Sequence, residues 1–288
     1  YNPNTVLFDL DTEFNTGCDA SHNPLTQYQD AKCYHPVNYD GLYRGPISIR
    51  NALAQSLNVP AVKVLYLTGI KNAINTARDM GITSLDINGD YGLSLVLGSG
   101  EVSLLKLTNA YATFANNGTY NPANFILSVT DKDGRVLEKY NPSPQEVIPE
   151  NVAAQINNIL SDYTAKIPAY GADSPLRFTD RQVASKTGTT NNFRDTWTIG
   201  YTPSVAVGVW AGNNDNTSID KKLSGMVAAP MWRAFMNIAN ASTTPEAFTP
   251  MSTSTYLINN PVVNGIYCNQ NGVATILSHI TNKEDLTY

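Results

Sequence analysis

The sequence predicts an α+β fold, with helices in the first half of the chain and an antiparallel sheet in the second half. Apolar residues recur at helical spacing through much of residues 49–116. Three strand-like runs follow one another between residues 182 and 211, joined by short connections. Helices followed by such a meander, without alternating strand and helix units, are typical of the α+β class and not of a doubly wound sheet.

The first 47 residues are rich in Asn, Asp, Tyr, Pro and Gly and show little periodicity, so we expect a long surface excursion. This segment contains two cysteines and two histidines, namely Cys18, His22, Cys33 and His35. The cysteines could form a disulfide in an oxidising compartment, and the four side chains have zinc-ligand chemistry at unusual spacings. The simplest interpretation is four polar residues in an irregular loop, and no metal is required.

Helical spacing begins at Ser48. Pro60 interrupts the pattern, so residues 56–58 are expected at the end of one helix, before a second begins. A short helix is expected over residues 71–80, closed by Gly81.

The middle of the chain predicts a helix, a hairpin and another helix. Residues 103–116 carry one continuous apolar stripe and give the strongest helical pattern in the chain. Residues 125–130 and 136–140 alternate around an Asp-Gly pair, which is typical of a β-hairpin. Residues 149–161 are again helical, with a proline near the first turn.

The predicted sheet consists of runs at residues 182–187, 196–201 and 205–211. A last helix is predicted over residues 228–240. Residues 251–288 are rich in Ser, Thr and Asn, so we expect a linker and a small β-like tail there.

Composition argues against a nucleic-acid partner and against a membrane span within this chain. The net charge is -5 and no run of Lys or Arg exceeds two residues, which argues against a nucleic-acid interface. No stretch approaches the roughly 20 apolar residues of a membrane span, and no signal peptide is visible. The chain starts with Tyr1 and not with Met, so we expect its start to lie inside a longer protein.

The most informative motif is Lys-Thr-Gly-Thr, residues 186–189, on the first predicted strand. Lys186 supplies positive charge, Thr187 and Thr189 supply hydroxyl donors, and Gly188 allows a ligand to approach the backbone closely. The edge of such a strand could also pair with an extended peptide through main-chain hydrogen bonds. Alone, the motif more often belongs to an ordinary surface strand that ends in a turn.

A second motif, Ser56-Leu57-Asn58, lies at the predicted helix end. In isolation, Ser and Asn at such a place are usually capping or turn residues. Together, however, Lys-Thr-Gly and Ser-x-Asn are two of the three signatures of active-site serine enzymes that recognise penicillin.

The flanks of both motifs resemble the transpeptidase domain of class A, bifunctional penicillin-binding proteins, more than the monofunctional class B enzymes. The matching blocks keep the family's order and span roughly residues 38–235. They are residues 38–45, 49–62, 97–103, 109–116, 186–190, 194–197, 200–203 and 208–212. The resemblance implies a penicillin-binding transpeptidase or serine β-lactamase-like fold, an antiparallel sheet with a helical subdomain. We expect the domain over residues 1–245, with residues 246–288 as linker and C-terminal tail.

The resemblance also implies an activity. The family cross-links peptidoglycan by D,D-transpeptidation: a serine attacks a D-Ala-D-Ala stem peptide, D-alanine leaves, and an acceptor amine on a second strand resolves the acyl-enzyme. β-Lactams acylate the same serine. No cofactor is implied, the location is extracytoplasmic, and a membrane is contacted only through an upstream anchor.

The family's roles carry over to matching positions. Ser56 would relay a proton to the leaving nitrogen, and Asn58 would hold a nearby lysine and the substrate amide. Lys186 would fix Ser56 and supply positive potential for the carboxylate and the developing oxyanion. Thr187 and Thr189 would bind the terminal carboxylate, with the backbone N–H of Thr189 in the oxyanion hole.

The family's third signature, a Ser-x-x-Lys that carries the nucleophile, does not occur ahead of Ser56. Two later copies, at residues 103–106 and 218–221, are assigned to structure, so no nucleophile is expected in this chain. Position 185 is Ser where the family commonly has Gly or Ala. We therefore expect an inactive fragment that lacks its first strands and nucleophile helix, and that is poorly stable or binds something in the gap.

Two alternatives stay open. One is a non-catalytic module that binds stem peptides through the Lys186 strand. The other is a D,D-carboxypeptidase or β-lactamase of the same superfamily, which the flanking blocks disfavour.

Overall fold

We describe the fold from a computed structural model, which covers residues 1–219 and 221–252, with backbone only at residues 191 and 221–226. The predicted linker and tail therefore lie outside the described residues from residue 253 onward. Phe248 is buried against Tyr201, with ring centroids 5.6 Å apart, so packing continues slightly beyond the predicted domain boundary at residue 245.

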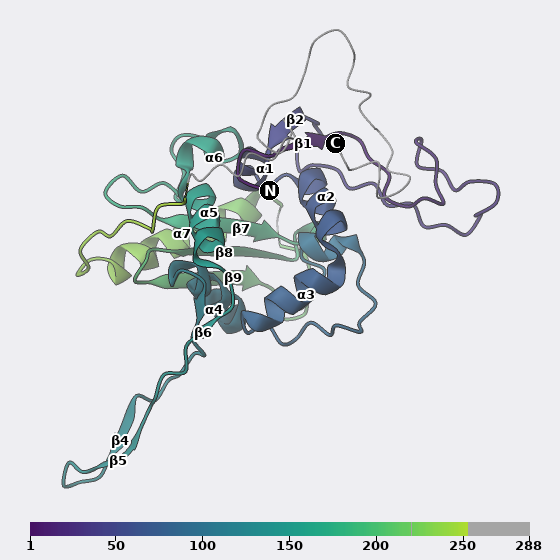
Figure 1. Ribbon diagram of the computed structural model, residues 1–288. Helices are drawn as coiled ribbons and strands as arrows, with labels where there is room; N and C mark the ends of the chain where they lie inside the picture. Colours follow the sequence, from purple (N-terminus) through teal and green to yellow (C-terminus); the bar gives the residue numbers. More distant parts are fainter. Residues whose placement is uncertain (220, 253–288) are drawn as a thin grey trace.

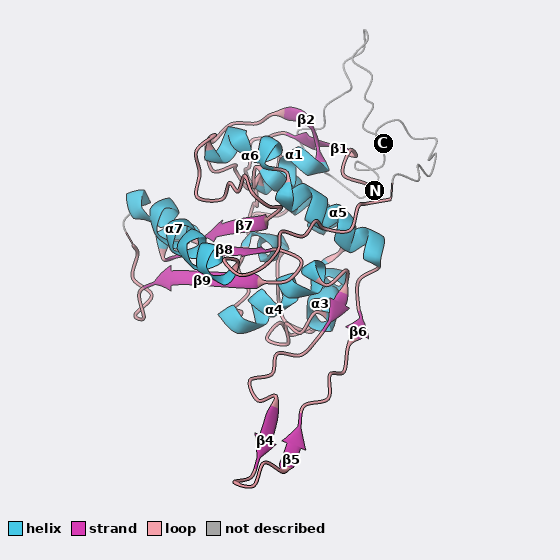
Figure 2. Cartoon of the chain, turned by 90° about the vertical axis from the view of Figure 1, so that its left-hand side faces the viewer, coloured by secondary structure: helices cyan, strands magenta, loops and turns pink. Residues whose placement is uncertain are grey.

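The central element is a three-stranded antiparallel sheet in the order β7-β8-β9. It consists of β7 (Ala184–Thr189), β8 (Asp195–Tyr201) and β9 (Ala206–Gly212), which confirms the three predicted runs. The register places Lys186 opposite Ile199. Among the described residues, no other strand pairs with the outer edge of β7, so the main-chain groups on that side are not part of a strand ladder (Figure 2).

Helices cover both faces of this sheet. An added Cβ at Gly208 would collide with the side chain of Thr108 on α4 (Leu104–Ala115), so that face packs on α4. Gly200 would likewise collide with Trp232 on α7 (Lys221–Ala239), which packs on the opposite face. Trp232 is fully buried and donates from its indole N–H to the carbonyl of Val207 at 3.2 Å. A further helix, α5 (Glu150–Ser161), contacts β7.

The helical half follows the predicted order α1 (Ile49–Ala54), α2 (Asn58–Thr68) and α3 (Ile70–Asp79). Ser56 and Leu57 lie between α1 and α2, as expected, whereas Asn58 is already the first residue of α2. The prediction that Pro60 separates two helices is wrong, because Pro60 lies in the first turn of α2. The N–H that proline lacks has no helical partner in a first turn, so the helix accommodates it there.

The prediction of an irregular excursion over residues 1–47 is wrong at its two ends. β1 (Val6–Asp9) is fully buried and pairs antiparallel with β2 (Gly45–Ser48). Four residues are too few to show a strand's alternation, and burial on both faces removes it. Between these strands, Cys18 and Cys33 form a disulfide with Cα atoms 5.7 Å apart, so of the alternatives for this loop the cysteine pair is the one found.

The predicted hairpin is formed by β4 (Ser128–Thr130) and β5 (Val136–Lys139), which project from the body as an arm (Figure 1). At its base, β3 (Thr119–Tyr120) pairs with β6 (Gln145–Glu146). The remaining elements are the 3₁₀ turns η1 (Leu93–Leu97) and η2 (Asn191–Phe193) and the helix α6 (Tyr163–Tyr170). Within the described residues, no helix combines the length and apolar character needed to cross a bilayer.

Candidate active site

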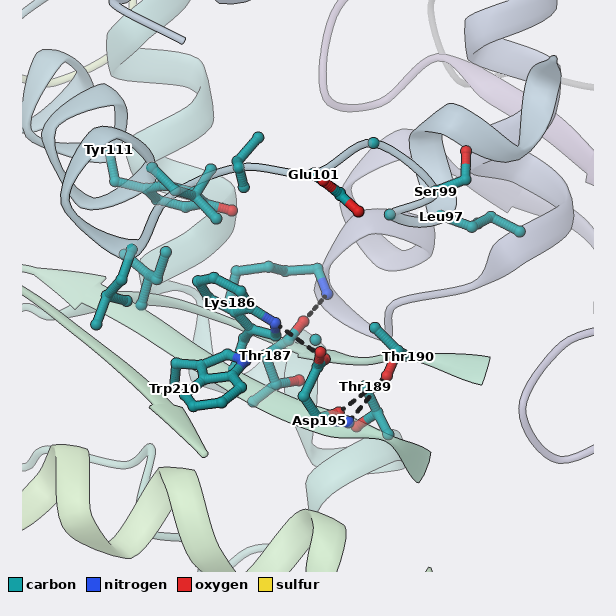
Figure 3. Close-up of a pocket in the computed structure, with 18 of the residues that line it drawn as sticks. Leu97, Ser99, Glu101, Tyr111, Lys186, Thr187, Thr189, Thr190, Asp195 and Trp210 are labelled. Atoms are coloured by element: carbon teal, nitrogen blue, oxygen red, sulfur yellow. Dashed lines mark hydrogen bonds between the residues drawn. The ribbon is translucent and has the colours of Figure 1, made fainter. Parts of the chain in front are cut away.

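A cavity of about 680 Å³ lies between β7 and the loop that connects η1 to α4. Figure 3 shows Leu97, Ser99 and Glu101 on one side, facing Lys186 and the threonines of β7. Apolar side chains from α4 and the neighbouring strands close the rest of the lining, namely Leu104, Leu107, Tyr111, Trp197, Ile199 and Trp210. Residues 97–102 therefore form one wall of the cavity. They belong to a matching sequence block for which the sequence alone predicts no role.

The structure brings the two sequence motifs together. The ammonium Nζ of Lys186 donates a hydrogen bond of 2.6 Å to Oγ of Ser56, which is 130 residues away in the chain. Nζ also donates to the carbonyl of Thr187 at 2.9 Å. Ser56 has φ of 59°, a left-handed conformation that is uncommon for residues other than glycine and that aims its side chain at β7. A hydroxyl and an ammonium are therefore fixed at hydrogen-bond distance beside the cavity.

Asn58 lies at the first position of α2, away from the Ser56–Lys186 hydrogen bond. Its side-chain amide donates to the carbonyl of Val37 at 2.7 Å, and its backbone N–H donates to Oδ1 of Asn38 at 2.9 Å. These two hydrogen bonds hold the turn that carries Ser56.

Alternate main-chain groups of β7 point away from β8. The carbonyls of Ser185 and Thr187 accept hydrogen bonds from the ammonium groups of Lys166 and Lys186, which are outside the ladder. In an antiparallel pair, the N–H and C=O of one residue point to the same side and the side alternates along the strand. The backbone N–H of Thr189 therefore points outward too, where an extended ligand could accept it.

Gly188 lies on the cavity face of β7. An added Cβ there would meet its nearest neighbour, Cβ of Trp197, at 3.5 Å, which is ordinary van der Waals contact. Packing within the chain therefore does not require glycine at this position. The space above Gly188 is available to a ligand that lies along the strand.

Two lysines meet at this strand: Lys186, half-buried on β7 itself, and Lys166, buried on α6 beside it. Desolvation by burial lowers the pKa of Lys186 to about 8. Burial, and secondarily the charge of Lys186, lowers the pKa of Lys166 to about 7. Lys166 donates to the carbonyl of Ser185 at 2.7 Å and to its Oγ at 2.8 Å. The hydroxyl at position 185, where the family commonly has no side-chain polar group, thus helps to satisfy a buried ammonium.

Folding stability should rise with pH above about 7, and Lys166→Met should weaken this rise. Since the folded state lowers the pKa of Lys166 from 10.5 to about 7, the unfolded state binds more protons in this window, and stability increases with pH until about 10.5. Urea unfolding from pH 7 to 9.5 should show a slope smaller by up to about 1.4 kcal/mol per pH unit in the variant. Exposed Lys106→Met is the control and should keep the full slope; equal slopes in all three proteins would contradict this assignment.

Sequence reasoning missed two residues that organise the site. The hydroxyl of Tyr170 on α6 lies 2.8 Å from Oγ1 of Thr187 and also hydrogen-bonds Ser56, so it links the two motifs. α6 escapes prediction because it is short and contains Pro168. The other missed residue is Asn38, which begins one of the matching blocks and could have been found only from its place there.

Asn38 is buried and connects β1 to the first turn of α2. Its amide nitrogen lies 2.9 Å from both carboxylate oxygens of Asp9 and 2.8 Å from the carbonyl of Leu42. Its Oδ1 accepts from the backbone N–H groups of Asn58 and Val59 at 2.9 and 3.3 Å. This network fixes the turn that places Ser56.

The Ser-x-x-Lys sequence at residues 103–106 is a helix cap. Oγ of Ser103 accepts from the backbone N–H of Lys106 at 3.3 Å and so caps α4. The copy at residues 218–221 includes Asp220, which lies outside the described residues.

Comparison of the sequence with known proteins identifies relatives over most of the chain. Residues 3–237 match the family described as the penicillin binding protein transpeptidase domain. Penicillin-binding protein 1A of Aquifex aeolicus is 35% identical over 231 residues, which cover 80% of this chain and 31% of the relative. Penicillin-binding protein 2D of Bacillus subtilis is 35% identical over 234 residues, 78% of this chain and 33% of the relative. The chain thus spans about a third of the length of these relatives.

Solved structures show the same fold. Penicillin-binding protein 1A from Haemophilus influenzae aligns with a TM-score of 0.72 at 21% identity, over 86% of this chain and 40% of that chain. PonA1 from Mycobacterium tuberculosis, solved in complex with penicillin V, aligns with a TM-score of 0.66 at 25% identity, over 82% of this chain and 66% of that chain. The predicted fold class is confirmed, and this chain belongs to the penicillin-binding transpeptidase family, with class A proteins among its relatives.

Proposed function

We propose that this chain supplies the substrate-binding part of a peptidoglycan D,D-transpeptidase domain. The observation that carries the proposal is the 2.6 Å hydrogen bond between Lys186 and Ser56 at the free edge of β7. The donor substrate is a stem peptide that ends in D-Ala-D-Ala, and β-lactams occupy the same place. The acceptor is an amine on a second stem peptide.

The terminal carboxylate of the donor binds next to Lys186. Burial lowers the pKa of Lys186 to about 8, which still lies above pH 7, so the ammonium form predominates there. The hydroxyls of Thr187 and Thr189 donate to the same carboxylate, and charge-assisted hydrogen bonds of this kind are the strong ones. The peptide backbone extends along the outer edge of β7, where the N–H of Thr189 points.

Ser56 serves as the proton relay. Its Oγ accepts a hydrogen bond from Lys186, so Ser56 can give its own proton to a leaving nitrogen in the cavity and take one from the ammonium. Asn58 and the Asn38 network hold the turn in position. In this proposal the side chain of Asn58 reaches a substrate amide only if its hydrogen bond to the carbonyl of Val37 breaks.

The acyl-accepting serine is supplied by a Ser-x-x-Lys segment outside residues 1–288. No such sequence precedes Ser56, and Ser103 is engaged as a helix cap. The 288-residue chain alone should therefore form no covalent adduct with penicillin.

Fluorescent penicillin followed by denaturing electrophoresis tests this proposal. The chain alone should give no labelled band, whereas a protein that joins it to a class A Ser-x-x-Lys helix should be labelled. Labelling of the chain alone would show that the nucleophilic serine lies within residues 1–288, contrary to the proposal. Absence of labelling in the folded, joined protein would favour the non-catalytic stem-peptide binding module.

A D,D-carboxypeptidase of the same superfamily is separated by its products. Water would replace the acceptor amine, so the joined protein would release D-alanine without forming cross-links.

We also propose an extracytoplasmic location, which the Cys18–Cys33 disulfide supports because such bonds persist in oxidising compartments.

A further inference from the structure

A second cluster of reactive side chains lies in the loop between β1 and β2, outside the proposed active site. Oε2 of Glu13 lies 3.2 Å from Nδ1 of His22 and 3.3 Å from Nδ1 of His35. All three ligand atoms lie within 4.8 Å of one another. Ligand atoms about 2.0–2.1 Å from a tetrahedral zinc ion are separated by about 3.3–3.4 Å, so two of the three separations already have the length of a tetrahedral edge.

The carboxylate of Glu13 is held so that one oxygen is left for a ligand. Glu13 is fully buried, and its Oε1 accepts backbone N–H groups from Tyr34 at 2.6 Å and Asn15 at 2.8 Å. Oε2 faces the two imidazoles. A buried carboxylate with one oxygen occupied and the other directed at two ring nitrogens has the geometry of a monodentate metal ligand.

His22 is oriented by a second carboxylate. Oδ1 of Asp11 lies 3.2 Å from Nε2 of His22, on the side of the ring away from Glu13. Metal-binding histidines usually donate their other N–H to a carboxylate in this way, which fixes the tautomer and the ring orientation. The hydroxyl of Tyr43 in turn donates to Asp11 at 3.2 Å.

The disulfide fastens the segment that carries these ligands. Cys18 precedes His22 and Cys33 precedes His35, so the bond joins the two ends of the loop that brings both rings to Glu13. The sulfur atoms also lie close to Glu13. Because zinc binds thiolates, however, the bonded cysteines are not ligands in the oxidised protein.

We propose that Glu13, His22 and His35 bind one Zn²⁺ ion, with water in the fourth position. Two imidazoles and one carboxylate are a ligand set that suits zinc. The rings are stacked, with centroids 3.9 Å apart and planes 19° apart, so both cannot direct a lone pair at one ion as they stand. Binding therefore requires the stack to open through rotation of the exposed side chain of His35. The proposal is independent of the proposed transpeptidase function.

Zinc titration of the oxidised, metal-free 288-residue chain by calorimetry at pH 7.5 tests this site. We expect binding of one ion per chain. His22→Ala and His35→Ala should each weaken it at least tenfold, and Asp11→Asn by about 10- to 100-fold through loss of ring orientation. Histidine NMR spectra should show zinc at Nδ1 of both rings. His279→Ala changes the third histidine of the sequence and should leave affinity unchanged.

Three results would overturn the proposal. The first is that zinc does not bind at one ion per chain. The second is that the folded His22→Ala and His35→Ala variants bind zinc as tightly as the unsubstituted chain. The third is that binding appears only after reduction and disappears in Cys18→Ser. The last result would identify a thiolate site instead. Circular dichroism of each variant shows whether a loss of binding reflects a loss of fold.

Discussion

Lys186→Ala is expected to slow acylation by penicillin about 100- to 1,000-fold in a protein that joins this chain to a Ser-x-x-Lys helix. The ammonium is the only described cation at hydrogen-bond distance from Ser56, and its loss removes positive potential from both the carboxylate and the developing oxyanion. Loss of one preorganised electrostatic donor typically has an effect of this size. Stopped-flow measurement of the second-order acylation rate constant gives the comparison.

Stability separates this effect from misfolding. Since burial lowers the pKa of Lys186, removing the ammonium should leave the melting temperature unchanged or raise it, most clearly in Lys186→Met. Lys106→Ala, on the exposed side of α4, is the matched lysine control and should acylate at the normal rate. A Lys186→Met protein that acylates within threefold of the unsubstituted rate would contradict the assigned role.

Asn38→Ala is expected to lower the free energy of unfolding by about 3–4 kcal/mol. The substitution removes the side-chain donor of the buried Asp9 carboxylate, which keeps only the backbone N–H of Arg44 among the described donors, and it removes the acceptor for the backbone N–H groups of Asn58 and Val59. Each buried polar group left unsatisfied costs about 1–3 kcal/mol. Urea unfolding of the 288-residue chain gives the measurement.

Asn124→Ala is the matched control for Asn38. Its side-chain amide also donates to a backbone carbonyl, that of Ile126 at 2.8 Å, but at an exposed position. The change should stay within about 0.5 kcal/mol. Equal effects at positions 38 and 124 would show that the buried network does not hold the Ser56 turn.

Elements with a long, regular pattern could be predicted from the sequence. The twelve residues of α4 carry one apolar stripe, and a serine cap before it and a glycine after it mark its ends in the sequence. The predicted helix over residues 103–116 therefore agrees with the observed one, Leu104–Ala115. β1 has only four residues, all buried, and α6 contains a proline. In those elements the long-range packing, and not the local pattern, decides the structure.

The residues of the site also fall into two groups: those that a short sequence motif predicts and those that only the fold reveals. Ser56 and Lys186 stand in short motifs with recognisable chemistry, so both could be singled out without coordinates. Tyr170 and Asn38 act only because the fold carries them to these motifs; nothing in the sequence around Tyr170 indicates a role, and only its place in a matching block points to Asn38. Glu13 is of the same kind: a single carboxylate becomes a candidate ligand only when two distant histidines fold against it.

A double-mutant cycle on Ser56 and Lys186 tests the central claim most directly, because the proposed function depends on these two side chains acting as a unit. Acylation rate constants would be compared for Ser56→Ala, Lys186→Ala and the double variant in the joined protein. We predict strong non-additivity: the double variant should be no more than about threefold slower than Lys186→Ala alone, a coupling of about 1.5–3 kcal/mol. Effects that simply multiply, or a Ser56→Ala protein with a normal rate, would contradict the account.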